Sequence, residues 1–403
     1  MRNRWLIALA AIGLHISIGS VYAWSVLTRP IMVDMGFTLS QTTWTFSLAI
    51  LMLGLSAGFL GSFAEKIGPK KSGLLAMLFW VAGLFGTAYA LSIHNLTLLY
   101  LFYGIIGGIG LGIGYITPVS TLVKYFPNRP GFATGLAIMG FGFAALIAGP
   151  LMQFLVAQVG LVNNFIILGV IYLLVMSASS LYLKAPQPKQ PPRTTKDKST
   201  MYVHNHGMLA NDAMKTWQFV ALWWIFFINI TCGIGLLSLA SPMAQETIGM
   251  TPAAAASLVG IIGIFNGGGR IAWSTISDFL GRAQTYILFF IMEIIAFYLL
   301  SQTHSTLTFQ ILILLIITCY GGGFSCMPAY LADLYGIRQL STIHGRILTA
   351  WGLAGIAGPM IVSYFHEAGY GYSMALVCFA VLFILNTIIA IVLKMYGKRD
   401  LHS

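Results

Sequence analysis

Long apolar segments alternate with short polar connections along almost the whole chain. Each segment is long enough for a membrane-crossing helix, which needs about 20 mainly apolar residues. The first segment lacks the small-residue pattern of a signal-peptide cleavage site, so we expect it to remain as a helix. The pattern predicts twelve such helices, in two sets of six, at residues 5–28, 43–64, 72–92, 97–123, 131–156, 161–183, 217–241, 252–277, 284–301, 307–332, 344–366 and 371–395.

One long polar stretch separates the two sets of helices. It contains the run APQPKQPPRTTKDKS, whose Pro, Lys and Thr content is typical of a solvated linker. The pattern therefore predicts an N-terminal six-helix bundle over residues 1–183, a cytoplasmic linker over 184–215 and a C-terminal six-helix bundle over 216–403.

Composition indicates that lipid is the solvent for most of this chain. Of its 403 residues, 58% are hydrophobic and 8% are charged, whereas soluble domains average roughly 25% charged residues. Its mean hydropathy is +0.85. These values exclude a cytosolic enzyme, a nucleic-acid-binding protein, a secreted disulfide scaffold and a disordered chain.

The net charge of +11 is a topology signal. Of the 21 Lys and Arg residues, 19 lie in the terminal regions, the linker or the even-numbered connections between helices. Cytoplasmic loops of membrane proteins carry an excess of Lys and Arg. We therefore expect both termini in the cytoplasm of a multi-pass protein of a prokaryotic-type inner membrane, with some attraction to anionic lipids.

The two halves of the chain repeat one another. The loop GSFAEKIGPKK at 61–71 follows the second helix, and STISDFLGR at 274–282 follows the eighth. A Gly-Pro pair in the fifth helix recurs in the eleventh, and Pro118 of the fourth helix corresponds to Pro328 of the tenth. All three correspondences fall at nearly one offset along the chain. Parallel six-helix repeats are the architecture of major facilitator transporters, which bind substrate between the repeats near the middle of the bilayer.

Several motifs carry a resemblance to known families. The loops with Glu65 and Asp278 resemble the cytoplasmic signature loop of the major facilitator superfamily, with Glu65 where an Asp is usual. More narrowly, GSVYAWSVL at 19–27, YFPNRPGFATG at 125–135 and FNGGGR at 265–270 resemble motifs of the oxalate/formate antiporter family. The resemblance covers essentially all twelve helices. It implies the major facilitator fold and a carrier of small carboxylates that needs no cofactor.

The resemblance also implies a set of binding residues. In the oxalate-carrying members, an Arg of the eighth helix and a Lys of the eleventh bind the dianion together. Here the Arg is present as Arg270, whereas the position of the Lys is taken by Trp351. This departure favours a substrate with one negative charge. The aromatic cage of the family corresponds to Tyr22, Tyr115, Phe141, Tyr320 and Phe324.

Physical reasoning singles out Arg270 as well. Asp278 marks the helix end, so Arg270 lies eight residues, or roughly 12 Å, inside the membrane. A guanidinium group stays protonated there, at a cost of about 2.5–3.5 kcal/mol, and its planar fork suits a carboxylate. The glycines at 267–269 are expected to leave room for a ligand or water. The alternative is a structural ion pair with Glu293, the only other charge deep in a helix.

Two residues are candidates for proton coupling. His15 shares a polar stripe of the first helix with Tyr22, whose hydroxyl is a donor for a carboxylate oxygen. Imidazole titrates near neutral pH, so His15 is one candidate proton carrier, although membrane histidines are more often packing residues. Glu293 is the other candidate.

The predicted cytoplasmic gate uses charges at helix ends. Glu65 and Asp278 end the second and eighth helices. The resemblance implies that they contact the N-terminal ends of the eleventh and fifth helices, where the helix dipole is positive. Arg346 and Arg129 lie near those ends and are the expected partners. The alternative is that these charges are simply solvated.

Catalytic chemistry is not predicted. The sequence contains no nucleophile–base set, phosphate-binding loop or metal cluster. The run GIIGGIGLGIG at 104–114 has glycine spacings similar to a dinucleotide motif, but it lies inside a membrane helix, where close helix packing explains it better. The four cysteines fall in apolar runs, so we interpret them as packing residues.

The resulting hypothesis is a secondary transporter, not an enzyme, that carries small monocarboxylates of the formate, lactate or pyruvate class. It would use proton symport or anion exchange and act as a monomer, without metal, cofactor or nucleic acid. One alternative is an oxalate/formate-type antiporter, and another is an exporter of a larger amphipathic compound, for which Arg270 would be dispensable. A third is a transporter-like membrane sensor with the linker, 184–215, as its output.

Overall fold

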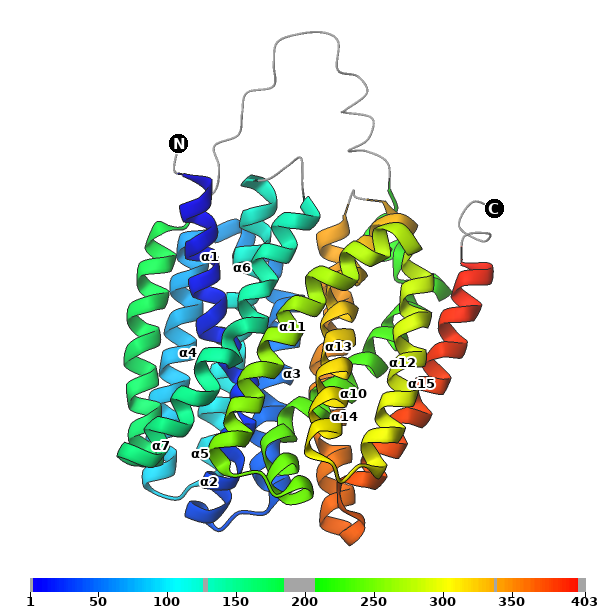
Figure 1. Ribbon diagram of the computed structural model, residues 1–403. Helices are drawn as coiled ribbons and strands as arrows, with labels where there is room; N and C mark the ends of the chain where they lie inside the picture. Colours follow the sequence, from blue (N-terminus) through cyan, green and yellow to red (C-terminus); the bar gives the residue numbers. More distant parts are fainter. Residues whose placement is uncertain (1–2, 126–129, 185–206, 337–338, 398–403) are drawn as a thin grey trace.

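The protein is entirely helical apart from one isolated β-bridge, throughout the residues that the structure describes. This computed structural model describes residues 3–125, 130–184, 207–336 and 339–397 (Figure 1). Within these ranges, a few side chains are also outside the description, namely those at 62, 65, 120, 123, 124, 130–134 and 341.

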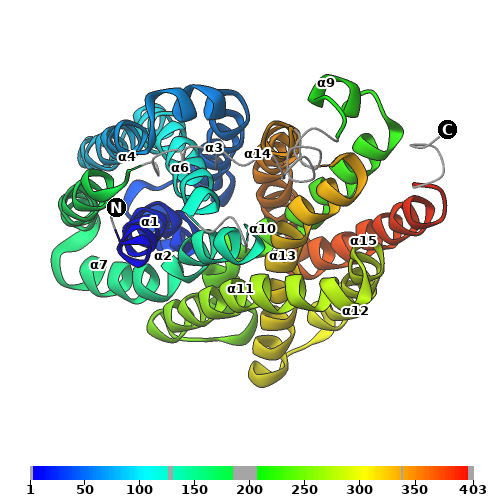
Figure 2. The same cartoon turned by 90° about the horizontal axis from the view of Figure 1, so that it is seen from above.

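Helices of the first half form one group, shown in blue to green in Figures 1 and 2. In chain order they are α1 (Arg4–Gly19), the 3-10 turn η1 (Ser20–Ala23), α2 (Ser25–Met35), α3 (Leu39–Ile67), α4 (Pro69–Ser92), α5 (Leu96–Leu99), the π-helix η2 (Tyr100–Gly107), α6 (Gly108–Tyr125) and α7 (Pro130–Tyr182).

Helices of the second half form the other group, and Figure 2 shows the two groups side by side. In chain order they are α9 (Ala210–Ala213), α10 (Trp217–Ile248), α11 (Pro252–Leu280), α12 (Arg282–Gln302), α13 (Thr306–Tyr335), α14 (Leu340–Phe365), the π-helix η3 (His366–Tyr370) and α15 (Gly371–Tyr396). The predicted domain limits at 183 and 216 stay predictions, and residues 185–206 of the predicted linker lie outside the described residues.

The described residues include ten helical stretches long and apolar enough to cross a membrane. Two of these stretches contain a sharp break, at Gly160 (φ 83°) and at Gly369 (φ 85°). Only glycine adopts such positive φ values without strain, so the chain reverses there and each stretch crosses twice. The ten stretches therefore provide the twelve crossings that the apolar pattern predicts, and the prediction of an all-helical membrane protein is confirmed.

Glycines allow the helices to approach closely. A methyl group at Gly110 of α6 would lie 2.6 Å from the backbone nitrogen of Trp80 in α4, and one at Gly108 would lie 2.7 Å from the carbonyl oxygen of Ala49 in α3. These distances are too short for any side chain. The packing interpretation of the glycine-rich run at 104–114 is confirmed.

The two halves meet mainly along two helix pairs, α3 with α14 and α7 with α11. Glycines face each other in both pairs: a methyl group at Gly54 would lie 2.5 Å from Gly352 Cα, and one at Gly142 would lie 3.0 Å from Gly267 Cα. The helices on either side of the molecular centre are therefore in backbone contact, and side chains from both halves converge between them.

Figure 1 shows the start of α1 and the end of α15 at the same end of the molecule. At the opposite end, polar contacts join the halves. Arg29 Nη1 of α2 donates to Gln245 Oε1 of α10 at 2.9 Å, and the backbone N–H of Ser40 in α3 donates to Glu367 Oε1 of η3 at 2.7 Å. The structure is therefore closed by interhalf contacts at the end away from these helix termini.

Candidate functional site

The seven predicted binding residues come together at the centre of the molecule, although they are far apart in sequence. Each is at most 3% exposed. Three come from η1, α6 and α7 of the first half, and four come from α11, α13 and α14 of the second. We call this group the central cluster: Tyr22, Tyr115, Phe141, Arg270, Tyr320, Phe324 and Trp351.

Trp351 of α14 is the hub of the aromatic rings. Its ring centroid lies 4.8 Å from that of Phe324, 5.1 Å from that of Tyr115 and 6.0 Å from that of Phe141, all in edge-to-face geometry. Tyr22 packs edge-on against Phe141 at 4.9 Å. These distances are typical of favourable aromatic pairs, so the rings form one continuous apolar wall drawn from both halves.

A hydrogen bond between two tyrosines joins the halves inside this wall. The hydroxyl groups of Tyr22 and Tyr320 are 2.8 Å apart and buried. Tyr22 lies in η1, where a 3-10 turn interrupts the first crossing, and such turns inside a helix often mark functional hinges. This bond must break whenever the two halves separate at the cluster.

Arg270 is 1% exposed on α11 and has few partners. Its Nε donates to Asn266 Oδ1, one turn earlier, at 3.2 Å, and its Cζ lies 4.9 Å from the ring centroid of Phe324. The hydroxyls of Tyr22 and Tyr115 lie near the guanidinium group. Both hydroxyls interact with the guanidinium group, but neither makes a well-formed hydrogen bond with Nη1 or Nη2, which have no such acceptor among the described residues.

The cluster therefore has a surplus of donors. Besides the two Nη atoms of Arg270, the indole Nε1 of Trp351 is buried without an acceptor in the described part of the chain. Arg270 and Trp351 pack against the same ring, that of Phe324. Buried donors without partners are uncommon and each costs about 1–3 kcal/mol. These three atoms give the cluster buried N–H groups that no described residue accepts.

The structure does not join Arg270 to Glu293. Glu293 lies on α12, and its Oε2 accepts from Asn229 Nδ2 of α10 at 3.4 Å. No ion pair between the two charges occurs in the described ranges. The alternative of a structural ion pair is therefore wrong, and Arg270 keeps its charge uncompensated by any described carboxylate.

His15 packs against two rings of the aromatic wall, those of Tyr115 and Phe141. Its ring stacks on Tyr115 at a centroid distance of 5.5 Å. Its Nδ1 is 2.5 Å from the carbonyl oxygen of Ala137, and its Nε2 is 2.9 Å from the carbonyl oxygen of Tyr115. Both ring nitrogens therefore face backbone, so His15 ties α1 to α6 and α7. Its role as a proton carrier stays a prediction.

The three glycines before Arg270 serve mainly helix contacts, which corrects the expectation that they leave room for a ligand. A methyl group at Gly269 would lie 2.5 Å from the carbonyl oxygen of Thr318 in α13, and one at Gly267 would lie 2.8 Å from the ring of Phe143. Only Gly268 faces open space. The glycines bring α11 against α13 and α7 and so place Arg270 at the meeting point of both halves.

The predicted gate charges are only partly described. Asp278 pairs with Arg282 at 2.5 Å, and Arg346 donates to Asn211 Oδ1 of α9 at 2.8 Å. The side chain of Glu65 and the whole of Arg129 lie outside the described residues. The pairs expected for these two residues therefore stay predictions.

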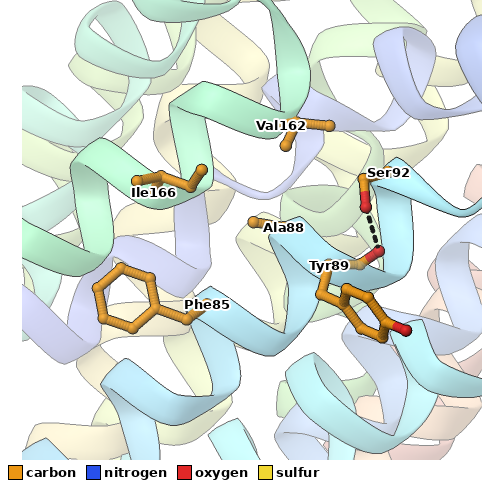
Figure 3. Close-up of a pocket in the computed structure, with 6 residues that line it drawn as sticks. All are labelled: Phe85, Ala88, Tyr89, Ser92, Val162 and Ile166. Carbon is orange, nitrogen blue, oxygen red and sulfur yellow. Dashed lines mark hydrogen bonds between the residues drawn. The ribbon is translucent and has the colours of Figure 1, made fainter.

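A surface pocket occurs well away from the cluster. It lies between α4 and the second crossing of α7 (Figure 3). The hydroxyl group of Ser92 donates to the backbone carbonyl oxygen of Tyr89 and is therefore already bonded. Its lining includes no residue of the central cluster and no charged side chain: Phe85, Ala88, Tyr89, Ser92, Val162 and Ile166. This apolar lining suits contact with lipid.

Sequence reasoning missed two residues that bind the buried ionisable side chains. Asn266 orients Arg270 through its side-chain oxygen, and Asn229 binds Glu293. A signal for Asn266 existed, since it precedes Arg270 by four residues and therefore shares its helix face. Asn229 gave no such signal, because it is 64 residues from Glu293.

Comparison with known proteins places the chain in a family. The model of the Major Facilitator Superfamily matches residues 7–283 and 222–401. The chain is 28% identical to the uncharacterized MFS-type transporter YhjX of Escherichia coli (strain K12), over 88% of this chain and 86% of that one. It is 25% identical to the oxalate:formate antiporter of Oxalobacter formigenes, over 88% and 83% of the two chains.

A solved structure shows the same fold. A bacterial homolog of the human lysosomal transporter Spinster, crystallised in an inward-facing and unoccupied conformation, superposes with a TM-score of 0.75 at 14% identity, over 97% of this chain and 96% of that one. The family match, the helix arrangement and the central cluster between two halves agree. The chain is a secondary transporter that belongs to the Major Facilitator Superfamily.

Proposed function

We propose that this transporter carries small monocarboxylate anions of the formate, lactate or pyruvate class, with the carboxylate bound between Arg270 and Trp351. The observation that carries the proposal is the surplus of buried donors, Arg270 Nη1 and Nη2 and Trp351 Nε1, with no described acceptor. A carboxylate has two oxygens and about four lone pairs, and it accepts the paired donors of a guanidinium group in bidentate geometry.

One charge on the substrate fits one charge in the site. Arg270 is the sole cationic side chain of the central cluster, and Trp351 supplies a neutral N–H where the oxalate-carrying members have a Lys. A monocarboxylate neutralises Arg270, whereas oxalate would leave a second negative charge in an apolar environment, at a cost of several kcal/mol. An oxalate/formate-type exchange is therefore the less favoured alternative, although formate itself fits.

The wall of the site supports a small acid with a short apolar part. Around the donors stand aromatic rings, and the hydroxyls of Tyr22 and Tyr320 are bonded to each other. A sugar needs many polar partners for its hydroxyl groups. A larger amphipathic compound would have to push apart rings that are in contact. The short chains of formate, lactate and pyruvate require the least displacement.

Transport would follow alternating access. The central cluster is buried from both sides, so a substrate reaches Arg270 only after the halves separate at one end. One entrance would open when contacts such as that of Ser40 with Glu367 break. The other entrance would open at the end that carries the helix termini. We assign the latter end to the cytoplasm of a prokaryotic-type inner membrane, because the sequence pattern predicts the Lys- and Arg-rich connections on the side of both termini.

The charge balance favours exchange or proton-coupled symport. A loaded site holds Arg270 and one carboxylate, which neutralise each other, whereas an empty site keeps a buried cation without a described counter-charge. A central Arg costs about 2.5–3.5 kcal/mol on the insertion scale. The loaded carrier should therefore reorient faster than the empty one, and net uptake should need a second event such as proton binding.

Uptake into proteoliposomes tests the proposal. Purified protein is reconstituted, the vesicles are preloaded with unlabelled acid, and entry of labelled formate, lactate and pyruvate is measured. The Arg270→Gln variant should lose this exchange. Its thermal stability should not fall, because the substitution removes an uncompensated buried charge. Lys215→Gln, which removes an exposed cation outside the cluster, is the matched control. Normal exchange in Arg270→Gln would refute the site.

A further inference from the structure

Glu293 is a buried acid with an incomplete set of hydrogen bonds. It lies on α12 and is 0% exposed, as is its partner Asn229 on α10. Asn229 Nδ2 donates to Glu293 Oε2 at 3.4 Å. The two remaining polar atoms of the pair, Glu293 Oε1 and Asn229 Oδ1, have no hydrogen-bond partner among the described residues. Both are acceptors when the acid is ionised, so neither can satisfy the other.

One proton resolves this arrangement. Bound at Glu293 Oε1, it creates an O–H donor on the residue that already contacts Asn229. A carboxylic acid and a carboxamide have matching shapes, so Oε1–H can donate to Asn229 Oδ1 beside the existing bond from Nδ2. Both unpartnered atoms are then satisfied, and the pair carries no net charge in its apolar environment.

Among the described residues, no positively charged side chain pairs with Glu293. The titratable groups near Glu293 are the thiols of Cys232 on α10 and Cys319 on α13, with Cys378 of α15 beside Cys232. No described cation forms an ion pair with Glu293. Ionisation of Glu293 would therefore leave an uncompensated buried charge, so a change in its protonation must accompany a change in its surroundings.

Helix α13 connects this pair to the central cluster. A side chain at Gly323 would collide with Asn229 Oδ1, so the α13 backbone rests directly on the amide. The next residue, Phe324, packs on the guanidinium group of Arg270 at 4.9 Å. Tyr286 of α12 donates to the carbonyl oxygen of Gly323 at 2.7 Å, which holds α13 to the helix of Glu293. A shift of α13 on substrate binding would change both sites together.

We propose that Glu293 and Asn229 form the proton-binding site that couples carboxylate transport to proton movement, with α13 as the shared element. The inference rests on the proposed carboxylate function and adds the site of the coupled proton. The proton passes from water on one side to Glu293 Oε1, stays there while the loaded carrier reorients, and returns to water on the other side. One carboxylate and one proton cross together, so the cycle moves no net charge.

Glu293→Gln separates coupling from structure. A Gln side chain keeps both hydrogen bonds of the protonated pair, because its amide N–H donates to Asn229 Oδ1 and its oxygen accepts from Asn229 Nδ2. The variant should therefore fold, yet it can neither bind nor release the proton. Asp212→Asn makes the same carboxyl-to-amide change at a half-exposed position on α9 and is the matched control.

The experiment measures two kinds of uptake in proteoliposomes, with labelled formate, lactate and pyruvate as probes. Exchange is followed in preloaded vesicles at equal pH on both sides. Net uptake is followed in empty vesicles with and without an inward acid gradient. In the wild type and in Asp212→Asn, the acid gradient should accelerate net uptake. In Glu293→Gln, exchange should continue near the wild-type rate and the acceleration by acid should be lost.

Different outcomes separate the inference from the proposed function. If the wild type exchanges a carboxylate but ignores the acid gradient, or if Glu293→Gln still responds to it, the proton site is refuted and the carboxylate function stands. If the wild type exchanges none of the three probes, the proposed function fails.

Infrared difference spectroscopy of the wild type gives a second readout if Glu293→Gln does not fold. The carbonyl stretch of a protonated carboxylic acid should change when formate is added and should shift in Asn229→Ala. An acid band that formate leaves unchanged would overturn the inference.

Discussion

Trp351→Phe is the sharpest test of the binding geometry, because it removes one donor and keeps an aromatic ring. The indole Nε1 of Trp351 is buried without an acceptor in the described structure, and its ring packs between Tyr115 and Phe324. If this N–H donates to the substrate carboxylate, its loss should weaken binding. The empty protein loses no hydrogen bond by this change.

The expected magnitude follows from the charge on the acceptor. A hydrogen bond to a charged group contributes about 1.5–3 kcal/mol, and each 1.4 kcal/mol changes affinity about tenfold. Trp351→Phe should therefore raise the half-saturating concentration of the substrate by roughly ten- to a hundredfold. Thermal stability of the substrate-free protein should fall only by the cost of the smaller side chain.

Trp80→Phe is the matched control. Trp80 is 1% exposed, and its Nε1 also lacks an acceptor in the described structure. It belongs to a separate aromatic group in the first half, where its ring centroid lies 5.5 Å from that of Tyr103. The two variants make the same chemical change, so they should lose similar stability, and only Trp351→Phe should lose affinity.

The assay is the concentration dependence of exchange in proteoliposomes, together with the thermal stabilisation that added substrate gives to the purified protein. An unchanged half-saturating concentration in Trp351→Phe would refute the role of the indole donor. An equal loss of affinity in Trp80→Phe would show that general loosening of the fold explains the effect.

Three further predictions concern the interhalf bond, the substrate charge and the helix contact behind Arg270. Tyr320→Phe leaves the buried hydroxyl of Tyr22 without its hydrogen-bond partner, so the closed arrangement of the two halves should be destabilised by about 1–3 kcal/mol. Cysteines placed in the cluster should then be labelled faster, and unchanged labelling would contradict this. Oxalate should compete poorly with formate, lactate and pyruvate, and Trp351→Lys should shift the order toward oxalate; oxalate as the best wild-type competitor would disprove the charge argument. Gly269→Ala, whose methyl group would meet the Thr318 backbone at 2.5 Å, should destabilise the protein by about 1–3 kcal/mol through overpacking, whereas Gly268→Ala, which faces open space, should unfold near the wild-type temperature.

The crossings of the membrane could be predicted from the sequence because lipid imposes a simple length rule on apolar segments. The ends of the helices were harder to predict. The window 43–64 corresponds to α3, which runs on through polar residues to Ile67, and the window 217–241 corresponds to α10, which continues to Ile248. Helices continue past the apolar core until a residue such as Gly68, with φ of 82°, ends them.

The residues of the candidate site also differ in how far the sequence alone identifies them. Arg270 was identifiable from the residues alone, because a charge inside an apolar segment is expensive wherever the helix lies. Aromatic residues such as Phe141 and Tyr115 are not identifiable in this way, because aromatic residues at helical spacing form the same sequence pattern in a packed core as in a binding cavity. Their selection depended on the family resemblance, and the structure confirms that they lie together.

Only the tertiary structure decided which groups contact one another. Two ionisable residues of opposite sign inside apolar segments are compatible with an ion pair. In the structure Glu293 instead accepts a hydrogen bond from Asn229, and Arg270 keeps two donors without an acceptor among the described residues. Likewise, Gly267 and Gly269 turned out to contact α7 and α13. The sequence by itself determined which residues must avoid lipid, since that follows from transfer free energy. Their partners follow from the packing of helices that are remote in the chain, and local sequence does not encode that arrangement.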